Sequence, residues 1–239
     1  MKLSVIIPAF NEEERLPDTL NQVFGYLDKS GLSGETEVLV IDDGSIDNTA
    51  AIVRARQEKN LKLIGTGRNF GKGAAVRTGV RQARGEAVLF LDADYSTALE
   101  ELEKFLPKLE QGYDLVIGSR AIRGARVLVS QNLIKIWLGK TGNLGVRLIL
   151  GLKVNDSQCG FKLFSTKAKK IFQEQTINGW GFDFELLYLA KKRGLIVLEL
   201  PVTWVNNKQS KVKPLDYFKT LGELFKIKFN DLRGIYEKK

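Results

Sequence analysis

Short apolar runs alternate with amphipathic stretches through the first half of the chain. The runs are rich in Val, Ile and Leu and suit buried strands; they occupy residues 3–8, 37–42, 61–64, 87–91 and 115–117. Between them, apolar residues at helical spacing predict helices over residues 12–29, 47–58, 73–83 and 99–109. Buried strands separated by helices are typical of a parallel sheet that helices cover on both faces. The first half therefore predicts an α/β fold with a mostly parallel central sheet.

Residues 128–152 break this alternation. Apolar residues at helical spacing, interleaved with basic ones, predict two short amphipathic helices joined near residues 139–142. A basic amphipathic helix that carries a Trp suits a membrane interface, although two helices packed on the core would show the same periodicity. The remaining pattern predicts short strands at 160–164, 197–200 and 202–205, a helix at 182–192 and a closing amphipathic helix at 215–232.

Composition removes several classes of chemistry. The 239 residues include no His, which excludes His-based catalytic triads, His-ligated zinc and His pH switches. The single cysteine, Cys159, cannot form an internal disulfide. No apolar run approaches the roughly 18 residues of a bilayer-spanning helix, so we expect a cytoplasmic protein or one that lies on a membrane surface.

The net charge of +9 is unevenly distributed. Residues 115–155 contain seven Lys or Arg and no Asp or Glu, and residues 208–239 contain nine Lys or Arg against four Asp or Glu. A basic excess confined to two segments indicates a polyanionic partner or an anionic membrane, with a solvated basic face as the alternative.

Acidic and amide side chains follow three of the predicted strands. The first strand leads into Asn11-Glu12, the second into Asp42-Asp43, and the fourth into Asp92-Ala93-Asp94. Parallel sheets bind ligands beyond the carboxyl ends of their strands, and crowded carboxylates repel one another unless a cation binds. These strand ends therefore predict a ligand site with a bound cation at one edge of the sheet.

Asp92 and Asp94 are the strongest candidates for metal ligands. Alternation along the strand turns both carboxylates to the same side, and two hard oxygen ligands suit Mg²⁺ or Mn²⁺ held jointly with ligand phosphates. The alternative is that an aspartate caps the next helix, although Ser96 or Thr97 could serve as that cap instead.

Glycines between residues 65 and 73 follow a strand and precede a helix, where backbone N–H groups can approach a phosphate or a ribose. The segment matches neither a dinucleotide fingerprint, which needs Gly in place of Phe70, nor a P-loop, which needs Ser or Thr after Lys72. A tight strand-to-helix turn is the alternative explanation.

These motifs, in this order, resemble those of the inverting family-2 glycosyltransferases with a GT-A fold. The matching runs are Val5-Ile-Ile-Pro-Ala-Phe-Asn-Glu12, Asp42-Asp-Gly-Ser45, the stretch 69–77, Asp92-Ala-Asp94 and Gly118-Ser-Arg120. Three later runs resemble polyprenyl-phosphate sugar transferases: Asp156-Ser-Gln-Cys-Gly-Phe-Lys-Leu-Phe164, Trp180-Gly-Phe-Asp-Phe-Glu-Leu-Leu187 and Ser210-Lys-Val-Lys-Pro214. Within these, the similarity is greatest to dolichyl-phosphate β-glucosyltransferases, with dolichyl-phosphate mannose synthases second. The resemblance implies a GT-A domain over residues 1–212, with residues 213–239 as a basic amphipathic helix packed on it.

The resemblance also implies a nucleotide-sugar site built from the strand ends. Its residues would be Pro8, Phe10, Glu12, Asp42, Asp43, Arg68, Asn69, Gly71, Lys72, Asp92 and Lys211. Pro8, Phe10 and Glu12 would line the base and ribose pocket, and Lys211 would belong to a lid over the diphosphate. Asp92 and Asp94 would hold that diphosphate through a divalent metal.

A catalytic set follows from the same resemblance, and it consists of Asp94, Arg120, Asp156, Gln158 and Glu185. Arg120 would reach the acceptor phosphate, and Glu185 would bound the pocket. Asp156 and Gln158 would lie near the reacting sugar. Mannose synthases often carry Gln where Ser96 stands here, so the resemblance favours a glucosyl over a mannosyl donor.

The reaction implied is transfer of glucose from UDP-glucose to a polyprenyl, dolichyl-type phosphate, with inversion and with Mg²⁺ or Mn²⁺ as cofactor. A phosphate monoester is already ionised near neutral pH, since its second pKa is about 6, so a strong general base is unnecessary. GDP-mannose is the alternative donor. We expect the protein to lie peripherally on the cytoplasmic face of a membrane.

Two other classes of protein explain less of the chain. A sugar nucleotidyltransferase normally places its Gly-rich Arg loop on the first strand, whereas here that loop follows the third. A basic nucleic-acid-binding domain would explain the net charge, but the carboxylates at the strand ends would repel phosphate. We therefore expect no nucleic-acid partner.

Overall fold

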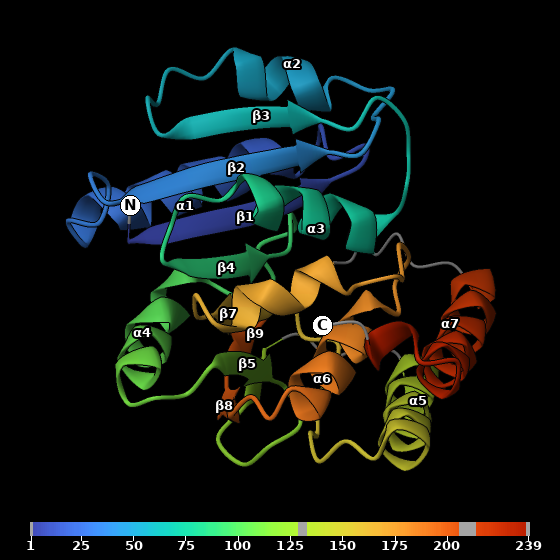
Figure 1. Ribbon diagram of the computed structural model, residues 1–239. Helices are drawn as coiled ribbons and strands as arrows, with labels where there is room; N and C mark the ends of the chain where they lie inside the picture. Colours follow the sequence, from blue (N-terminus) through green and yellow to red (C-terminus); the bar gives the residue numbers. More distant parts are fainter. Residues whose placement is uncertain (1, 129–132, 206–213, 238–239) are drawn as a thin grey trace.

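A seven-stranded sheet forms the centre of the molecule (Figure 1). The computed structural model describes residues 2–128, 133–205 and 214–237. Its main strands are β1 (Leu3–Ala9), β2 (Thr36–Asp42), β3 (Leu61–Gly65), β4 (Ala87–Leu91), β5 (Leu115–Ser119), β7 (Phe161–Phe164) and β8 (Val197–Pro201). They lie in the order β3-β2-β1-β4-β7-β5-β8, in which β7 is antiparallel to β4 and β5 and the other pairings are parallel. The prediction of a mostly parallel sheet is confirmed.

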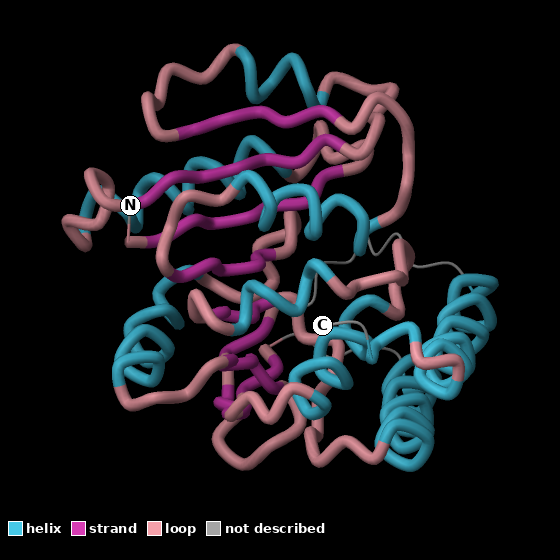
Figure 2. The backbone as a smooth tube through the Cα atoms, viewed as in Figure 1, coloured by secondary structure: helices cyan, strands magenta, loops and turns pink. Residues whose placement is uncertain are grey.

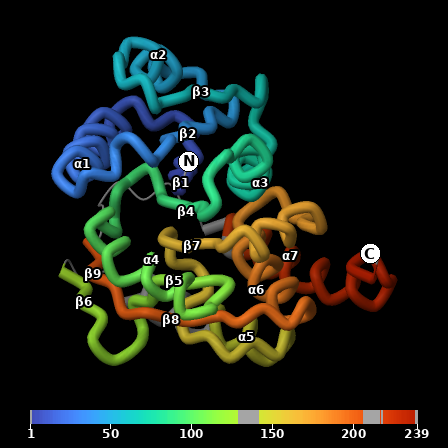
Figure 3. Tube along the Cα trace, turned by 60° about the vertical axis from the view of Figure 1, so that its left-hand side comes forward, coloured from blue at the N-terminus to red at the C-terminus, as the bar shows by residue number. Residues whose placement is uncertain are grey.

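Helices cover both faces of this sheet, as the sequence predicts. One face carries α1 (Leu16–Lys29), α2 (Thr49–Arg54) and α4 (Leu102–Glu110), and the other carries α3 (Lys72–Gln82), α5 (Leu133–Leu150), α6 (Phe182–Lys192) and α7 (Pro214–Leu232). Strand residues alternate between the two cores, so that Val5 and Ile7 share a core with α1 while Ile6 shares one with α3. Figure 3 shows β1–β3 with α1 and α2 at one end of the molecule and β5, β8 and α5 at the other.

Smaller elements complete the described chain. β6 (Arg126–Val127) and β9 (Thr203–Trp204) form a separate parallel pair, and short 3₁₀ helices occupy Leu99–Glu101, Ala168–Gln173 and Ile235–Glu237. An isolated antiparallel bridge joins Thr97 to Trp204, and Val205 donates a backbone hydrogen bond to the carbonyl of Ser96. The segment around β9 is therefore tied to the loop that follows β4.

The predicted pair of short helices within residues 128–152 is wrong, because α5 is one continuous helix from Leu133 to Leu150. Glycine costs a helix only about 1 kcal/mol per residue and keeps its backbone N–H, so glycines inside α5 do not break it as a proline would. Helix α1 also begins later than predicted, since residues 12–15 form a turn before Leu16. No helix within the described ranges is both long enough and apolar enough to cross a bilayer.

Helix α7 packs against α5 and α6, and Figure 1 shows α5 and α7 side by side. Its Glu223 accepts a hydrogen bond of 2.7 Å from the backbone N–H of Gly181, the residue that precedes α6. At the other end of α6, Lys192 forms an ion pair of 2.5 Å with Asp231 of α7. A carboxylate at a helix N-terminus is favourable because it accepts hydrogen bonds from free N–H groups and because its negative charge interacts favourably with the helix dipole.

Helix α3 lies unusually close to the sheet at Gly79. A Cβ atom at this position would lie 2.4 Å from Cγ2 of Ile6 and 3.0 Å from Cγ1 of Ile41. The absence of a side chain at Gly79 therefore lets α3 approach β1 and β2 closely. Helix α3 begins at the sheet edge where those two strands end.

We expect Gly79→Ala to destabilise the protein by about 1–3 kcal/mol through overpacking, despite the higher helix propensity of Ala. Gly25→Ala in α1 is the matched control, because its Cβ would meet no atom within 4 Å. That control should raise stability by about 0.5–1 kcal/mol. Urea unfolding of both variants measures the difference, and equal stability for the two would contradict the close approach at Gly79.

Candidate active site

The loops that follow β1 and β2 meet beyond the carboxyl ends of these strands, where Figure 2 shows loops gathered. Asn11, with a φ of 54°, accepts a hydrogen bond of 2.9 Å from Ile46 N–H and donates its own N–H to Ser45 Oγ at 2.9 Å. Phe10 is 39% exposed beside this junction, whereas Pro8 lies buried within β1. The two loops thus form one surface with an exposed aromatic ring.

Glu12 is almost buried and is held by its own neighbours. Both its carboxylate oxygens accept hydrogen bonds from Arg15, at 2.7 and 2.6 Å, and its backbone N–H donates to Thr49 Oγ1 at 2.7 Å. The backbone N–H of Glu12 therefore joins the start of α1 to the start of α2, and Arg15 compensates the charge of its side chain.

Asp42 and Asp43 are adjacent but play different structural parts. Asp43 accepts hydrogen bonds from Thr66 Oγ1 (3.1 Å), Phe70 N–H (3.0 Å) and Gly71 N–H (2.7 Å), so both of its oxygens hold the Gly-rich loop. The Asp42 carboxylate accepts a hydrogen bond from the N–H of Ser45 at 2.9 Å. Of the two residues, Asp42 has the carboxylate with fewer contacts inside the chain.

The Gly-rich loop is exposed along its outer side and tightly packed along its inner side. Arg68, Asn69 and Phe70 are exposed, and the Arg68 guanidinium lies 4.6 Å from the centre of the Phe70 ring. Gly71 has a φ of 103°, and a Cβ there would lie 2.5 Å from the carbonyl oxygen of Asn178. The loop is thus wedged between Asp43 and the segment before α6.

Asp92 and Lys72 form the central ion pair of this region. Lys72 Nζ lies 2.7 Å from Asp92 Oδ1, and the same ammonium group lies 4.9 Å from the centre of the Trp180 ring. Burial alone would lower the pKa of Lys72, but Asp92 and Asp183 outweigh that effect and raise it. Lys72 therefore stays charged and already acts as the cation that the strand-end carboxylates require.

Asp92 and Asp94 fit a divalent cation by the chemistry of their oxygens and by their surroundings. Gly160 touches Asp92, since a Cβ at residue 160 would lie 1.9 Å from Asp92 Oδ2. Asp94 accepts the N–H of Ser96 at 3.0 Å. The part of the chain that the structure describes contains no cluster of three acidic or Cys ligands, and phosphate oxygens and water would complete the coordination of such an ion.

The alternative that these residues cap the following helix is wrong. That helical segment opens at Leu99 after Ala98, with no side-chain cap at its N-cap position, and the N–H of Leu99 donates to Tyr95 Oη at 2.9 Å. The two aspartates are therefore not needed to begin that segment.

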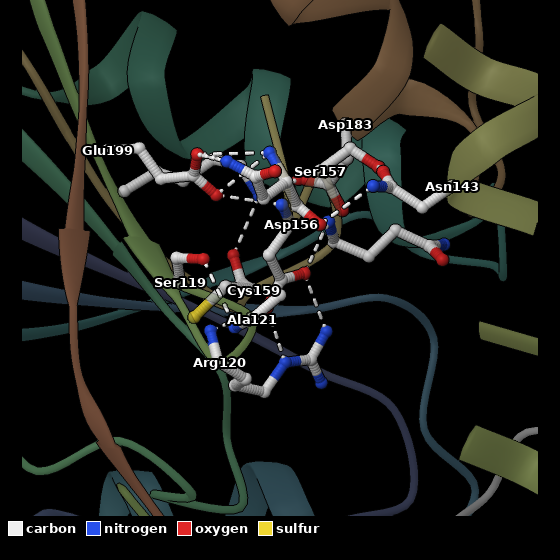
Figure 4. A network of polar contacts seen from close by, with 12 residues as sticks. Ser119, Arg120, Ala121, Asn143, Asp156, Ser157, Cys159, Asp183 and Glu199 are labelled. Atoms are coloured by element: carbon white, nitrogen blue, oxygen red, sulfur yellow. Dashed lines mark hydrogen bonds and ion pairs between the residues drawn. The ribbon is translucent and has the colours of Figure 1, made fainter. Parts of the chain in front are cut away.

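Arg120, directly after β5, is held by Asp156 in a bidentate pair (Figure 4). Arg120 Nε and Nη2 lie 2.6 and 2.8 Å from the two Asp156 oxygens, and the Arg120 backbone N–H adds a bond of 2.9 Å. Burial would raise the pKa of Asp156, but Arg120 reverses this and lowers it. The Arg120 side chain remains 29% exposed, while Gln158 lies exposed nearby and donates its N–H to Asp156 at 3.3 Å.

Glu185 does not join this group of residues. Its side chain is fully buried and accepts hydrogen bonds from Thr176 N–H (2.8 Å), Thr176 Oγ1 (2.6 Å), Tyr236 Oη (2.6 Å) and Ile177 N–H (2.8 Å). We therefore assign Glu185 to the framework, where it ties α6 to the C-terminal turn. Lys211, expected in a lid, lies outside the described residues.

Two charged residues that sequence reasoning missed lie beneath the site. Lys162 in β7 and Asp183 in α6 form a buried ion pair of 2.6 Å. The sequence does contain a sign of each buried charge: a lysine lies within the apolar strand Phe161–Phe164, and an aspartate lies within the apolar start of α6. Neither charged residue indicates the other in the sequence, and only the structure shows that they form a pair.

Comparison with known proteins agrees with this geometry. The family model described as Glycosyl transferase family 2 matches residues 4–172. The chain is 34% identical to the dolichyl-phosphate β-glucosyltransferase of Dictyostelium discoideum, over 98% of this chain and 76% of that protein. It is 35% identical to the protein of that name from Drosophila melanogaster (99% and 77% covered) and 32% identical to the one from Homo sapiens (98% and 77%).

Solved structures of glucosyl-3-phosphoglycerate synthase from Mycobacterium tuberculosis share the fold. The complex with Mn²⁺, UDP and glucosyl-3-phosphoglycerate has a TM-score of 0.68 at 17% identity, over 95% of this chain and 79% of that one. The complex with Mn²⁺, UDP-glucose and phosphoglyceric acid gives 0.68 at 18% identity, over 95% and 80%. The predicted GT-A fold is confirmed.

We expect Glu185→Gln to lower the free energy of unfolding by about 1–3 kcal/mol, because an amide NH₂ would face hydrogen-bond donors in a buried site. If Glu185 belongs to the framework, the folded fraction should keep its full transferase activity. Chemical unfolding together with activity per folded molecule tests this, and a loss of activity at unchanged stability would restore the catalytic assignment.

Proposed function

The chain belongs to glycosyl transferase family 2, and from that membership we propose that it transfers glucose from UDP-glucose to a polyprenyl, dolichyl-type phosphate with inversion. The observation that carries the proposal is the grouping of Lys72, Asp92 and Asp94 with the Asp156-held Arg120 near the ends of β4 and β5. Carboxylates suit a metal-bound diphosphate, and a guanidinium suits a second phosphate. The named relatives support the choice of sugar and lipid.

We propose that Asp92 and Asp94 bind Mg²⁺ or Mn²⁺ together with the donor diphosphate. When bound, the ion would neutralise negative charge on the departing diphosphate. Lys72 would add its ammonium group to the same diphosphate. The Mn²⁺ and UDP in the mycobacterial structures support a divalent ion here, without deciding between the two metals.

The nucleoside would lie against the loops that follow β1, β2 and β3. Phe10 offers an exposed ring for the base, and Asp42 offers the carboxylate with fewer internal contacts for a base N–H or a ribose hydroxyl. Pro8, Glu12 and Asp43 would shape this pocket from within, since their side chains are buried or already paired. Bordering residues in the proposed site are Arg68, Asn69 and Gly71, with Lys211 as the proposed lid residue.

The acceptor would be oriented by Arg120. Its part-exposed guanidinium can bind the lipid phosphate while Asp156 fixes its direction, and Gln158 would lie near the sugar. One phosphate oxygen attacks the anomeric carbon as the bond from that carbon to the diphosphate oxygen breaks, and the electron pair leaves with UDP. No proton has to move, because the attacking phosphate is already ionised, which suits a protein without His. Asp156 is therefore a positioning residue rather than a base.

Membrane association is supported by an exposed apolar face on α7 and α5. Its members are Phe218, Leu221, Phe225, Phe229 and Leu232 on α7, and Leu144 and Leu148 on α5, each 49% exposed or more. The spacing on α7 of three or four residues puts its members on one side, and Lys219 and Lys226 are exposed on the same helix, with exposed Arg233 directly after it. We propose that this face lies on the anionic cytoplasmic surface of a membrane, with residues 213–239 docking the transferase domain of residues 1–212 there.

Incubation with labelled UDP-glucose, Mn²⁺ and dolichyl phosphate should put label into an extractable, acid-labile lipid. We expect Asp94→Asn or a chelator to reduce transfer by about 10²- to 10³-fold, as for loss of other groups that stabilise developing charge. Asp18→Asn, an exposed aspartate on α1, is the control and should be fully active. Lipid labelled from GDP-mannose but not from UDP-glucose would show that the proposed donor is wrong. A folded protein that labels no lipid from any donor would overturn the proposal of a lipid acceptor.

Phe225→Ser should weaken binding to phosphatidylserine-containing vesicles. Loss of a half-buried aromatic contact removes about 1–2 kcal/mol, which is roughly a 5- to 30-fold change in affinity. Ile196→Ser, a substitution of a residue 55% exposed outside both helices, is the control and should bind as the original protein does. Vesicle flotation measures both, and equal loss in the two variants would argue against a defined docking face.

A further inference from the structure

The Lys162–Asp183 pair is the most deeply buried ion pair among the described residues. The Lys162 and Asp183 side chains are 0% and 5% exposed, and the bond of 2.6 Å joins the middle of the sheet to the first turn of α6. We infer that this pair is a positioning device for the donor site, which sets the place of Asp92 and shares the charge of Lys72. The inference rests on the proposed function.

Stability alone does not account for the pair. Two charges taken out of water lose their hydration, and apolar residues of similar volume often give an equally stable protein in such a place. The neighbours of Lys162 in β7 are Phe161, Leu163 and Phe164, all fully buried, so an apolar residue would suit the strand. A charged pair at this point therefore calls for another reason.

Lys162 sets the backbone on which Asp92 rests. Its Nζ donates a hydrogen bond of 2.7 Å to the carbonyl oxygen of Cys159. The next residue, Gly160, accepts the N–H of Asp92 at 3.1 Å, and it leaves no room for even a methyl group beside the Asp92 carboxylate. A shift of residues 159–160 would therefore move Asp92 directly.

Asp183 acts on the same site through Lys72. Its carboxylate attracts the Lys72 ammonium group, as that of Asp92 does. The ammonium groups of Lys72 and Lys162 both approach the Phe90 ring, at 5.2 and 5.8 Å from its centre. Two lysines, each with its own aspartate partner, thus approach one aromatic ring.

Lys72 and a metal ion compete for the Asp92 carboxylate. With Asp183 present, Lys72 has a second carboxylate, so Asp92 can bind a metal ion while the lysine remains compensated. Without Asp183, Lys72 depends on Asp92 alone and competes with the metal for it. Loss of the pair should therefore weaken metal-dependent nucleotide binding more than it changes the fold.

The test replaces both members, Lys162→Met with Asp183→Asn, so that no unpaired charge stays buried. Calorimetric titration with UDP, with and without Mn²⁺, should show Mn²⁺-dependent affinity about 10- to 100-fold weaker, as for outer partners of metal ligands in general. UDP binding without metal and the melting temperature should change little. The control is Lys192→Met with Asp231→Asn, which removes another Lys–Asp pair, of 2.5 Å, from the far end of α6.

A folded double variant with the original Mn²⁺-dependent affinity would overturn the inference, as would an equal loss in the control. Should the double variant not fold, Lys162→Gln with Asp183→Asn decides, because two amides can keep a hydrogen bond in the same place while both charges are removed. The same selective loss of affinity supports the inference, and unchanged affinity overturns it. If the unaltered protein bound UDP with Mn²⁺ but labelled no lipid, only the proposed acceptor would fail; no Mn²⁺-dependent UDP binding at all would overturn the proposed donor site itself.

Discussion

Repulsion among carboxylates at one edge of the sheet is the constraint on which the rest of this structure depends. Two like charges 4 Å apart cost about 4 kcal/mol at an effective dielectric constant of 20, so the acidic strand ends could not lie together without compensation. The chain supplies it locally: Arg15 pairs with Glu12, Lys72 with Asp92, and Arg120 with Asp156. The basic side chains of the site are therefore part of its architecture, in addition to any contact they make with phosphate.

The partners of each carboxylate separate the framework acids from those proposed to bind ligands. Asp43 and Glu185 accept hydrogen bonds on both oxygens from neighbouring backbone and hydroxyl groups, and they hold the Gly-rich loop and the C-terminal turn. Asp92 is balanced by a lysine, whose flexible side chain can leave it when another cation arrives. A site that exchanges ligands needs carboxylates with a displaceable partner, such as Asp92, on a scaffold held by carboxylates such as Asp43 and Glu185.

The second half of the chain connects this site to the surface proposed to meet the membrane. Glu223 of α7 holds the backbone at Gly181, one residue from Trp180, whose ring lies 4.9 Å from the Lys72 ammonium. The opposite side of the same helix carries the exposed Phe225 and Phe229. One helix thus contacts the loop beside the proposed diphosphate subsite and presents apolar side chains outward, as the proposed lipid-borne acceptor would require.

The sequence by itself determined the alternation of strands and helices in the first half, the acidic strand ends and the family. Periodicity and motifs are local, and the strand ends of a parallel sheet converge by geometry. It could not determine which acids remain available. Glu185 looks like a site residue in its motif, yet Tyr236, far along the chain, donates to its carboxylate. The Lys162–Asp183 pair, the antiparallel insertion of β7 and the contact of Gly160 with Asp92 were likewise decided only by tertiary structure. The physical reason is common to all of them: a buried charge is defined by its partner, and a partner distant in sequence leaves no local signal.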